Sequence, residues 1–366
     1  MPVPEVPWID QHEDVERLAA ALETHGAVGV DTEFLRERTF FPKLCVLQIA
    51  AGGRIWCVDA LHSRTLEPLA RVLTDARSRK LIHSARQDLE AFHVATGQLV
   101  APVFDTQIAA GCIGLKPQIG YAELVRTLLD VQLPKGQTRT DWSRRPLTGA
   151  QLAYAADDVR YLEAVSEQLL ERLERLGRTA WALEDCAALA DARLYAPDPE
   201  QAWRRLKRLR ALAPAVRARL RLLAAWRERR AIERDLPRGW VLSDEALIDI
   251  AQRNPTDRAA LAALRSLPEQ LAAATAAALL EVLHAPLELT PEDLAPARDA
   301  PSEAEKALVA RLAARLDACA AELEVSPELL ATRAELRALA AGERDLTVLK
   351  GWRRPVIGEL LLAALG

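Results

Sequence analysis

The stretch Ala27-Val28-Gly29-Val30-Asp31-Thr32-Glu33-Phe34 ends an apolar run with two acidic side chains. A short run of valine and glycine that closes in polar residues is typical of a buried strand. Alternate side chains of a strand point to the same face, so Asp31 and Glu33 should project together. Two carboxylates held this close repel each other unless a divalent cation or a proton lies between them. Because an Asp at a strand end is commonly a turn residue, the pair needs support from other parts of the chain.

Further strands and helices are predicted around this stretch. The predicted strands span residues 6–9, 44–50, 54–58, 80–83 and 103–104, and predicted helices span 65–73 and 86–95. Gly52-Gly53 indicates a hairpin turn between two of the strands. Asp10 and Glu13 have the spacing of a capping box and predict the start of a helix that runs to about residue 24. Strands that alternate with helices after an opening meander predict an α/β domain with a mixed sheet.

The chain of 366 residues is long enough for two or three domains, and a content of 50% apolar and 27% charged residues is ordinary for a globular protein. The net charge of −4 argues against a uniformly basic surface for nucleic acid. Five cysteines without a CxxC pair predict reduced core residues. The sequence shows neither a signal-peptide pattern nor an apolar run of membrane-spanning length, so we expect a cytoplasmic protein.

A strongly basic segment follows a linker predicted at Pro197 and Pro199. Residues 200 to 238 contain thirteen Lys or Arg against four acids. This excess fits contact with a polyanion, and it fits equally the solvated faces of arginine-rich helices. Trp203, Trp226 and Trp240 are expected in a helical core, although one exposed Trp would point to base stacking instead. A second linker is predicted at 284–301, so three domains are expected.

Three further residues could share a site with the acidic pair. Asp88 lies in the first turn of a predicted helix that follows a strand, where a side chain reaches the end of a neighbouring strand. Tyr154 and Asp158 are four residues apart and share one face of a predicted helix. Each has an ordinary alternative: Asp88 can satisfy the helix start, and the other two can pack at a helix surface. Asp157, three residues from Tyr154, is a rival for the place of Asp158.

The order of these motifs resembles the DEDD superfamily of exonucleases, in its subclass with a tyrosine. The stretches that carry the resemblance are Asp31-Thr32-Glu33-Phe34, Leu44-Cys45-Val46-Leu47-Gln48-Ile49, His83-Ser84-Ala85-Arg86-Gln87-Asp88-Leu89-Glu90, Phe104-Asp105-Thr106-Gln107 and Tyr154-Ala155-Ala156-Asp157-Asp158-Val159. Within the superfamily they look like the bacterial ribonuclease D family. Residues 227–251 resemble its helicase-and-RNase-D C-terminal (HRDC) module, and residues 302–366 resemble a second, divergent copy.

The resemblance implies a ribonuclease H-like α/β catalytic domain with a mixed sheet at residues 1–195, followed by two small all-α HRDC-like domains at 200–283 and 302–366. The implied activity is 3′–5′ exoribonuclease cleavage that releases nucleoside 5′-monophosphates. The implied substrate is RNA with a single-stranded 3′ end, in particular transfer-RNA precursors, and we expect a monomer. A DNA exonuclease and a catalytically silent RNA-binding scaffold stay open as alternatives, because no motif here reads the 2′-hydroxyl.

The resemblance also implies roles for individual residues. Two divalent ions, Mg²⁺ or Mn²⁺, would be held by Asp31, Glu33, Asp88 and Asp158, and Tyr154 would orient the attacking water. From their positions beside these motifs, substrate contacts are expected of Phe34, Arg139, Arg144 and Arg145. The alternatives are a place in the core for Phe34, and for the arginines a structural loop anchored by Trp142.

Overall fold

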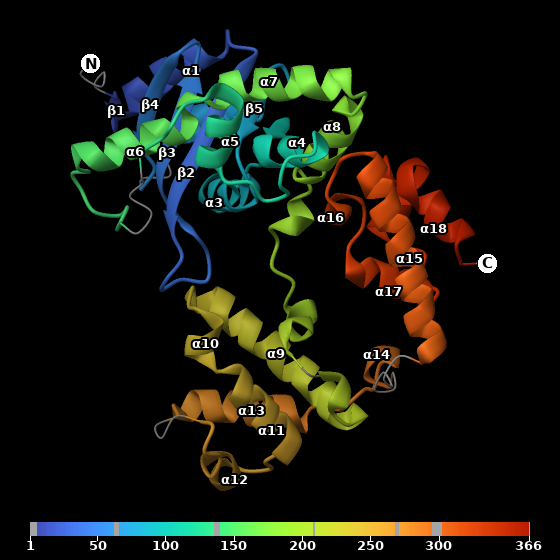
Figure 1. Ribbon diagram of the computed structural model, residues 1–366. Coiled ribbons are helices and arrows are strands. Elements are labelled where there is room, and N and C mark those ends of the chain that lie inside the picture. Colours follow the sequence, from blue (N-terminus) through green and yellow to red (C-terminus); the bar gives the residue numbers. More distant parts are fainter. Residues whose placement is uncertain are drawn as a thin grey trace. The chain divides into compact units, whose positions relative to one another are not determined.

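The computed structural model describes residues 6–61, 66–134, 140–207, 209–267, 271–294 and 302–365. The chain divides into two compact units, and Figure 1 traces it in sequence colours. The first unit comprises Met1–Leu35, Pro42–Tyr195 and Ser302–Gly366, and the second comprises Arg36–Phe41 and Ala196–Pro301. A short segment near the N-terminus therefore belongs to the unit that is otherwise built from residues after 195.

The first unit contains a six-stranded mixed sheet. Its strands are β1 (Trp8–Ile9), β2 (Ala27–Leu35), β3 (Lys43–Ala51), β4 (Arg54–Asp59), β5 (Arg79–Ile82) and β6 (Val103–Asp105), in the order β1-β4-β3-β2-β5-β6. β2, β3 and β4 form an antiparallel meander, while β1 pairs with β4, β5 with β2, and β6 with β5 in parallel. The predicted α/β domain with a mixed sheet is confirmed.

Helices cover both faces of this sheet. They are α1 (His12–Leu22), α2 (Glu67–Leu73), α3 (Arg86–Thr96), α4 (Thr106–Cys112), α5 (Tyr121–Leu129), α6 (Gly149–Arg160), α7 (Leu162–Arg175) and α8 (Thr179–Ala188). One core joins α1, α2 and α3 to the face that carries Val28 and Val30. On the other face α6 and α7 pack on β2 (Figure 1), and a Cβ built on Gly29 would lie only 3.4 Å from Leu162 Cδ1. Asp31 and Glu33, in register with Gly29, therefore point to the face of α6 and α7.

The predicted capping box at the start of the first helix is wrong. Helix α1 begins at His12, and its N-cap residue Gln11 makes no side-chain capping bond. Asp10 lies one residue too early to cap, directly after β1, and its carboxylate accepts a hydrogen bond of 3.0 Å from the Gln11 side-chain amide instead. The acid at Glu13 lies in the first turn, where it still favours the helix through the helix dipole.

Asp105 connects the end of β6 to the start of α3. Its carboxylate accepts hydrogen bonds from the backbone N–H groups of Ser84 at 3.0 Å and Ala85 at 2.8 Å, just before α3. The same carboxylate caps α4 by accepting from the N–H of Gln107 at 2.8 Å. A buried acid that bonds two chain segments at once fixes the entry of α3, and with it the first turn that contains Asp88.

The described residues from 302 onward form a helical region of the first unit. Its α-helices are α15 (Glu303–Glu322), α16 (Pro327–Leu330), α17 (Arg333–Ala340) and α18 (Glu359–Ala363), around a separate core. This region packs on α8. The guanidinium of Arg353 donates to both carboxylate oxygens of Asp185 at 2.7 and 2.8 Å, and Trp352 stacks on Trp181 with ring centroids 4.3 Å apart.

The second unit is helical and is organised around one long helix. Its α-helices are α9 (Pro214–Arg234), α10 (Arg238–Val241), α11 (Asp244–Arg253), α12 (Arg258–Ala262), α13 (Ala273–His284) and α14 (Pro291–Leu294), preceded by the 3₁₀ helices η3 (Pro199–Arg205) and η4 (Leu209–Ala211). η3, α11 and α13 all pack on α9 around a common core. Pro199, predicted in a linker, thus opens a 3₁₀ helix whose Ala202 is buried.

Most of the arginines between residues 200 and 238 bond to protein acceptors. Those with such partners are Arg204, Arg205, Arg217, Arg219, Arg221, Arg227, Arg229, Arg230 and Arg238. Their acceptors include the buried carboxylates of Glu228 and Asp293. Much of the local positive charge therefore stabilises the unit itself, an arrangement that the sequence pattern did not reveal. Separately, none of the helices described in either unit combines the length and apolarity needed to span a membrane.

Candidate active site

The acidic pair lies where the sheet loses a strand. β5 pairs with β2 from Ala27 to Gly29, and the pairing given for the two strands ends there. β2 continues beside β3 as far as Leu35, with an irregularity in register between Glu33 and Phe34. Asp31 and Glu33 therefore occupy the part of β2 that extends past β5, next to the start of α3. Side chains from α3 and from the facing helix α6 can approach them at this edge.

Four carboxylates from three elements lie close together there, as the sequence pattern predicted. They are Asp31 and Glu33 of β2, Asp88 of α3 and Asp158 of α6, and we call them the carboxylate cluster. Ligand oxygens of Asp31, Glu33 and Asp158 all lie within 4.8 Å of one another. Asp88 is the charged neighbour that acts most strongly on Asp31, although it lies outside that tighter trio.

The carboxylate cluster is electrostatically strained in the absence of cations. Burial raises the pKa of Glu33 to about 8, and repulsion from Asp158 and Asp88 adds to the shift. Burial also raises the pKa of Asp88 and of Asp158 to about 7 each, and it holds the pKa of Asp31 well above its ordinary value. The charged neighbours that shift these groups are all carboxylates, so repulsion between acids adds to the effect of burial.

This donor set fits hard divalent cations. Carboxylate oxygens are the ligands that Mg²⁺ and Mn²⁺ prefer in proteins. A divalent ion among these carboxylates removes the repulsion that raises their pKa values. No basic side chain among the described residues has to be displaced for the ion to bind. The buried geometry and the ligand chemistry agree, and the protein uses divalent metal ions.

Tyr154 lies against the cluster on the same helix as Asp158. The two side chains are hydrogen-bonded, as expected for residues one turn apart on one helix face. The ring of Tyr154 packs near Trp142, with centroids 6.1 Å apart. Burial, followed by repulsion from Asp158, raises the pKa of the Tyr154 hydroxyl above its ordinary value. The phenol therefore keeps its proton at neutral pH and acts as a hydrogen-bonding group.

Asp157, the rival of Asp158, is directed elsewhere. Its carboxylate forms an ion pair with Arg160 at 2.7 Å, within α6. Asp158 is the member of the dipeptide whose oxygens lie beside Asp31 and Glu33. The structure thus brings together Asp158 and the acidic strand.

Two polar residues that the sequence analysis did not assign to the site also contact the cluster. The hydroxyl of Thr32 donates a hydrogen bond of 2.5 Å to Oδ1 of Asp88. The Nε2 amide of Gln48, on β3 directly opposite Asp31, donates to Oδ2 of Asp31 at 3.4 Å. Gln48 is fully buried, and its Oε1 atom has no partner among the described residues. A buried Gln within an apolar strand was the signal that could have revealed it.

The predicted substrate residues that the structure describes are not members of this cluster. Phe34 is half-buried and packs against the core beneath α3. Arg139 lies outside the described residues. Arg144 is exposed, and its Nε donates to Oδ2 of Asp141 at 3.2 Å. Substrate contact by Phe34 and Arg144 stays a prediction.

Arg145 has a structural role that the sequence pattern left open. Its Nε and Nη2 donate to the two carboxylate oxygens of Asp59, each at 2.8 Å. Nη1 donates to the carbonyls of Trp142 at 2.8 Å and Arg144 at 2.9 Å, and Nη2 also donates to that of Cys45 at 2.9 Å. All five N–H donors of the guanidinium are occupied. Arg145 thus anchors the loop beside the site, as the alternative involving Trp142 expects, and its contact with substrate stays a prediction.

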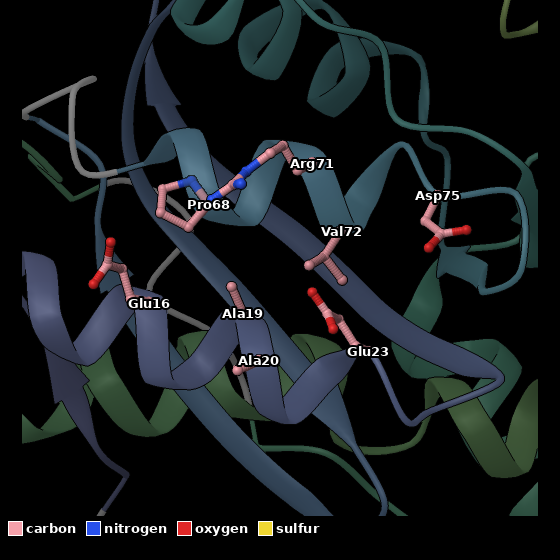
Figure 2. Close-up of a pocket in the computed structure, with 8 residues that line it drawn as sticks. All are labelled: Glu16, Ala19, Ala20, Glu23, Pro68, Arg71, Val72 and Asp75. Atoms are coloured by element: carbon pink, nitrogen blue, oxygen red, sulfur yellow. The ribbon is translucent and has the colours of Figure 1, made fainter.

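A hollow of about 340 Å³ lies on another part of the first unit, between α1 and α2 (Figure 2). Glu16 and Glu23 line it from α1, and Arg71 and Asp75 line it from the side of α2. None of its lining residues belongs to the carboxylate cluster. The hollow has the mixed charge of an ordinary surface groove.

Comparisons with known proteins agree with this geometry. The chain matches the 3′–5′ exonuclease family over residues 6–174 and the HRDC domain family over residues 216–283. It is 41% identical to the ribonuclease D of Gluconacetobacter diazotrophicus, over 98% of this chain and 93% of that protein. It is 37% identical to the ribonuclease D of Pseudomonas paraeruginosa, over 99% and 98% of the two chains.

A solved structure matches the whole fold. The crystal structure of Escherichia coli RNase D superposes with a TM-score of 0.88 at 30% sequence identity. The match covers 99% of this chain and 98% of that one. The likeness therefore extends over both compact units and is not limited to the sheet that carries the carboxylate cluster.

Proposed function

The chain belongs to the ribonuclease D family and is a 3′–5′ exoribonuclease, and from that premise we propose that the carboxylate cluster is its catalytic centre. We propose further that Tyr154 belongs to this centre and that the cluster holds two divalent ions. The observation that carries the proposal is the close approach of four mutually repelling carboxylates, from β2, α3 and α6, at one edge of the sheet, where Asp88 is buried and the other three are half-buried. Such an arrangement costs stability unless cations bind it.

The roles of the residues follow from their positions. Asp31, at the centre of the cluster, is suited to contact both ions, with Glu33 and Asp158 completing one site and Asp88 the other. Two divalent ions at such a site supply an activated water, charge stabilisation on the phosphoryl oxygens and support for the leaving oxygen. The protonated hydroxyl of Tyr154, hydrogen-bonded to Asp158, orients the attacking water.

The substrate that we propose is structured RNA with a single-stranded 3′ end, and transfer-RNA precursors are its first candidates. The Escherichia coli relative is described as an exoribonuclease involved in structured RNA processing. Hydrolysis from the 3′ end would release nucleoside 5′-monophosphates. The HRDC domain at residues 216–283, and residues 302–366 as a divergent second copy, would bind the body of the RNA. We expect the protein to act as a monomer, with Mg²⁺ or Mn²⁺ as the ion.

The decisive experiment is digestion of a 5′-labelled transfer-RNA precursor, with and without EDTA, by wild type and by Asp31→Ala. We expect stepwise shortening from the 3′ end by the wild type alone, and only without EDTA. A matched DNA strand, digested in parallel, measures the preference for ribose. Shortening that persists in EDTA, or that Asp31→Ala performs at the wild-type rate, would show that the catalytic centre lies elsewhere.

A further inference from the structure

Trp240 of α10 is exposed to an unusual degree. The structure describes all eight tryptophans of the chain, and Trp240 is the one whose side chain is exposed, at 62% of its accessible area. It is also the most exposed large hydrophobic side chain among the described residues. Trp203 and Trp226, which the sequence pattern grouped with it, pack against the core of the second unit. The core position expected for Trp240 is therefore wrong.

The backbone around Trp240 is held firmly by α9. Arg238, two residues earlier, bonds through Nε and Nη2 to the carboxylate of Glu228 at 2.5 and 2.6 Å, and Glu228 is almost fully buried. Two residues later, the carbonyl of Leu242 accepts a hydrogen bond of 2.9 Å from Nη1 of the buried Arg227. The indole is thus presented on a fixed support. A Trp side chain has only two rotatable bonds, so it loses little conformational entropy when a flat partner stacks on it.

Cationic side chains adjoin this support. The guanidinium of Arg238 lies over the ring of Phe40, 4.4 Å from its centroid, within the segment Arg36–Phe41. That segment also donates the backbone N–H groups of Phe40 and Phe41 to Oδ1 of Asp235, each at 3.0 Å. Asp235 is thereby engaged in hydrogen bonds within the same unit.

Two arginines of these same segments are exposed. Arg234 ends α9, and Arg38 lies in the bound segment; both are exposed, and neither has an ion-pair partner among the residues that the structure describes. They differ in this respect from the paired arginines that make up most of the basic segment. An exposed indole on a fixed backbone, with unpaired guanidinium groups on the connected segments, has the chemistry to bind a base and its phosphates.

We propose that Trp240 is a base-stacking platform for a single-stranded part of the RNA, with Arg234 and Arg38 contacting the adjacent phosphates. The proposal rests on the proposed RNA substrate and specifies where the second unit contacts it. Stacking tolerates any base, because every base has a π face, so this contact adds affinity without sequence preference. A protein partner would also use an exposed Trp, but the unpaired arginines favour a polyanion.

The test measures RNA binding apart from catalysis. Anisotropy of a labelled single-stranded oligoadenylate is followed in EDTA for wild type, Trp240→Ala, Trp240→Leu and Trp240→Phe. We expect Trp240→Ala and Trp240→Leu to weaken binding by between about five-fold and a hundred-fold, and Trp240→Phe to retain most of the affinity. Leu294→Ala, which truncates another exposed apolar side chain of the same unit, serves as the control and should bind like wild type.

Two further readouts separate stacking from phosphate contact. In a series of oligonucleotides, each lacks the base at one position. Wild type should bind more weakly to those in which the base that stacks on Trp240 is missing, whereas the affinity of Trp240→Ala should hardly change across the series. Trp240→Ala should keep the wild-type slope of log Kd against log salt, whereas Arg234→Ala should lower that slope by about one. Thermal unfolding checks that each variant is folded, and Trp240→Leu preserves an apolar side chain if the alanine variant is not.

The outcome that overturns the proposal is wild-type affinity in both Trp240→Ala and Trp240→Leu, or an equal loss for intact and abasic strands. EDTA-sensitive trimming by wild type is measured on the same preparations. If wild type trims while the Trp240 variants bind normally, the stacking platform alone is refuted. If wild type does not trim, the proposed catalytic centre is refuted, and the binding data still decide the role of Trp240.

Discussion

Thr32 and Asp88, 56 residues apart in the chain, are joined by a buried hydrogen bond of 2.5 Å from the threonine hydroxyl to Oδ1. The bond links the far face of the acidic strand to α3, and it fixes one oxygen of Asp88. We expect Thr32→Val to lower kcat/KM about ten-fold, because a carboxylate that loses a charge-assisted hydrogen bond is no longer held in one orientation. Thr32→Ser keeps the donor and should retain most activity. Equal activities of the two variants in trimming assays would contradict this role.

The adjacent acids Asp157 and Asp158 should behave differently. We expect Asp158→Ala, like Asp31→Ala, to lower the trimming rate by about a thousand-fold or more, which corresponds to the several kcal/mol that a metal contributes to the transition state. Asp157→Ala breaks only an ion pair within α6 and should stay within about ten-fold of wild type. The measurement is single-turnover trimming of labelled RNA at saturating Mg²⁺. The opposite order of the two variants would exchange their assignments.

The carboxylate cluster should make the metal-free protein less stable as the pH rises. The pKa of Glu33 is about 8 in the folded protein against 4.5 for the ordinary group, so the folded state holds more protons between these values. Protonated Glu33 therefore contributes its full stabilisation of the folded state below about pH 4.5, and this contribution is lost as the pH rises through about 8. Glu33→Gln cannot titrate, so its melting temperature in EDTA should fall less between pH 5.5 and 8.5 than that of wild type, as scanning calorimetry would measure.

Divalent ions should reverse this loss. Because metal binding requires ionised carboxylates, added Mg²⁺ or Mn²⁺ should raise the melting temperature of wild type more at pH 8 than at pH 6. Asp31→Ala should show a much smaller rise at either pH. A metal effect that is equal at both pH values would mean that the ions bind to groups other than the buried acids.

Removal of the Tyr154 hydroxyl should impair catalysis without preventing metal binding. We expect Tyr154→Phe to lower kcat about a hundred-fold. This is the lower end of the range of effects seen when a side chain that takes part in general acid–base catalysis is removed. Because the pKa of Tyr154 is raised, its ionisation should not appear in the pH profile of the wild type below pH 9. Calorimetric titration with Mn²⁺ provides the control, since the carboxylates remain in place. A variant with wild-type kcat would exclude the water-orienting role.

The two neighbouring arginines offer a matched pair. Arg145→Ala should lower the free energy of unfolding by about 3 kcal/mol, because it leaves the buried Asp59 without its bidentate partner. Arg144→Ala should leave stability unchanged and weaken RNA binding several-fold, with a lower salt slope. Urea unfolding and anisotropy titrations measure the two effects. If Arg144→Ala binds RNA like wild type, the predicted phosphate contact of this exposed side chain is wrong.

Local patterns predicted the parts of the site that depend on local geometry. Alternation along β2 was sufficient to place Asp31 and Glu33 on one face, and four-residue spacing was sufficient to place Tyr154 with Asp158. The raised pKa values of these groups were beyond such patterns, because burial and mutual repulsion arise only when β2, α3 and α6 are assembled.

Two features that sequence reasoning did not resolve depend on long-range partners. Two of the five donors of Arg145 bond to Asp59, 86 residues away, so no local feature distinguished Arg145 from the exposed Arg144. Trp240 lies outside the core because α10 is only one turn long and is oriented by the contact between Arg238 and Glu228. The wrong capping box at Asp10 has a local cause. Helix α1 starts one residue later than the spacing of Asp10 and Glu13 requires, so Asp10 cannot cap it.

The contact between Asp185 and Arg353 has a consequence for the newly made protein. These residues are separated by 168 positions, so a ribosome must translate the whole of the second unit after α8 before Arg353 and Trp352 are available. Throughout that interval the indole of Trp181 lacks its stacking partner, and the nascent chain presents an aromatic surface that a folding chaperone can bind. Synthesis in vitro, interrupted before residue 350, would produce this intermediate for direct study.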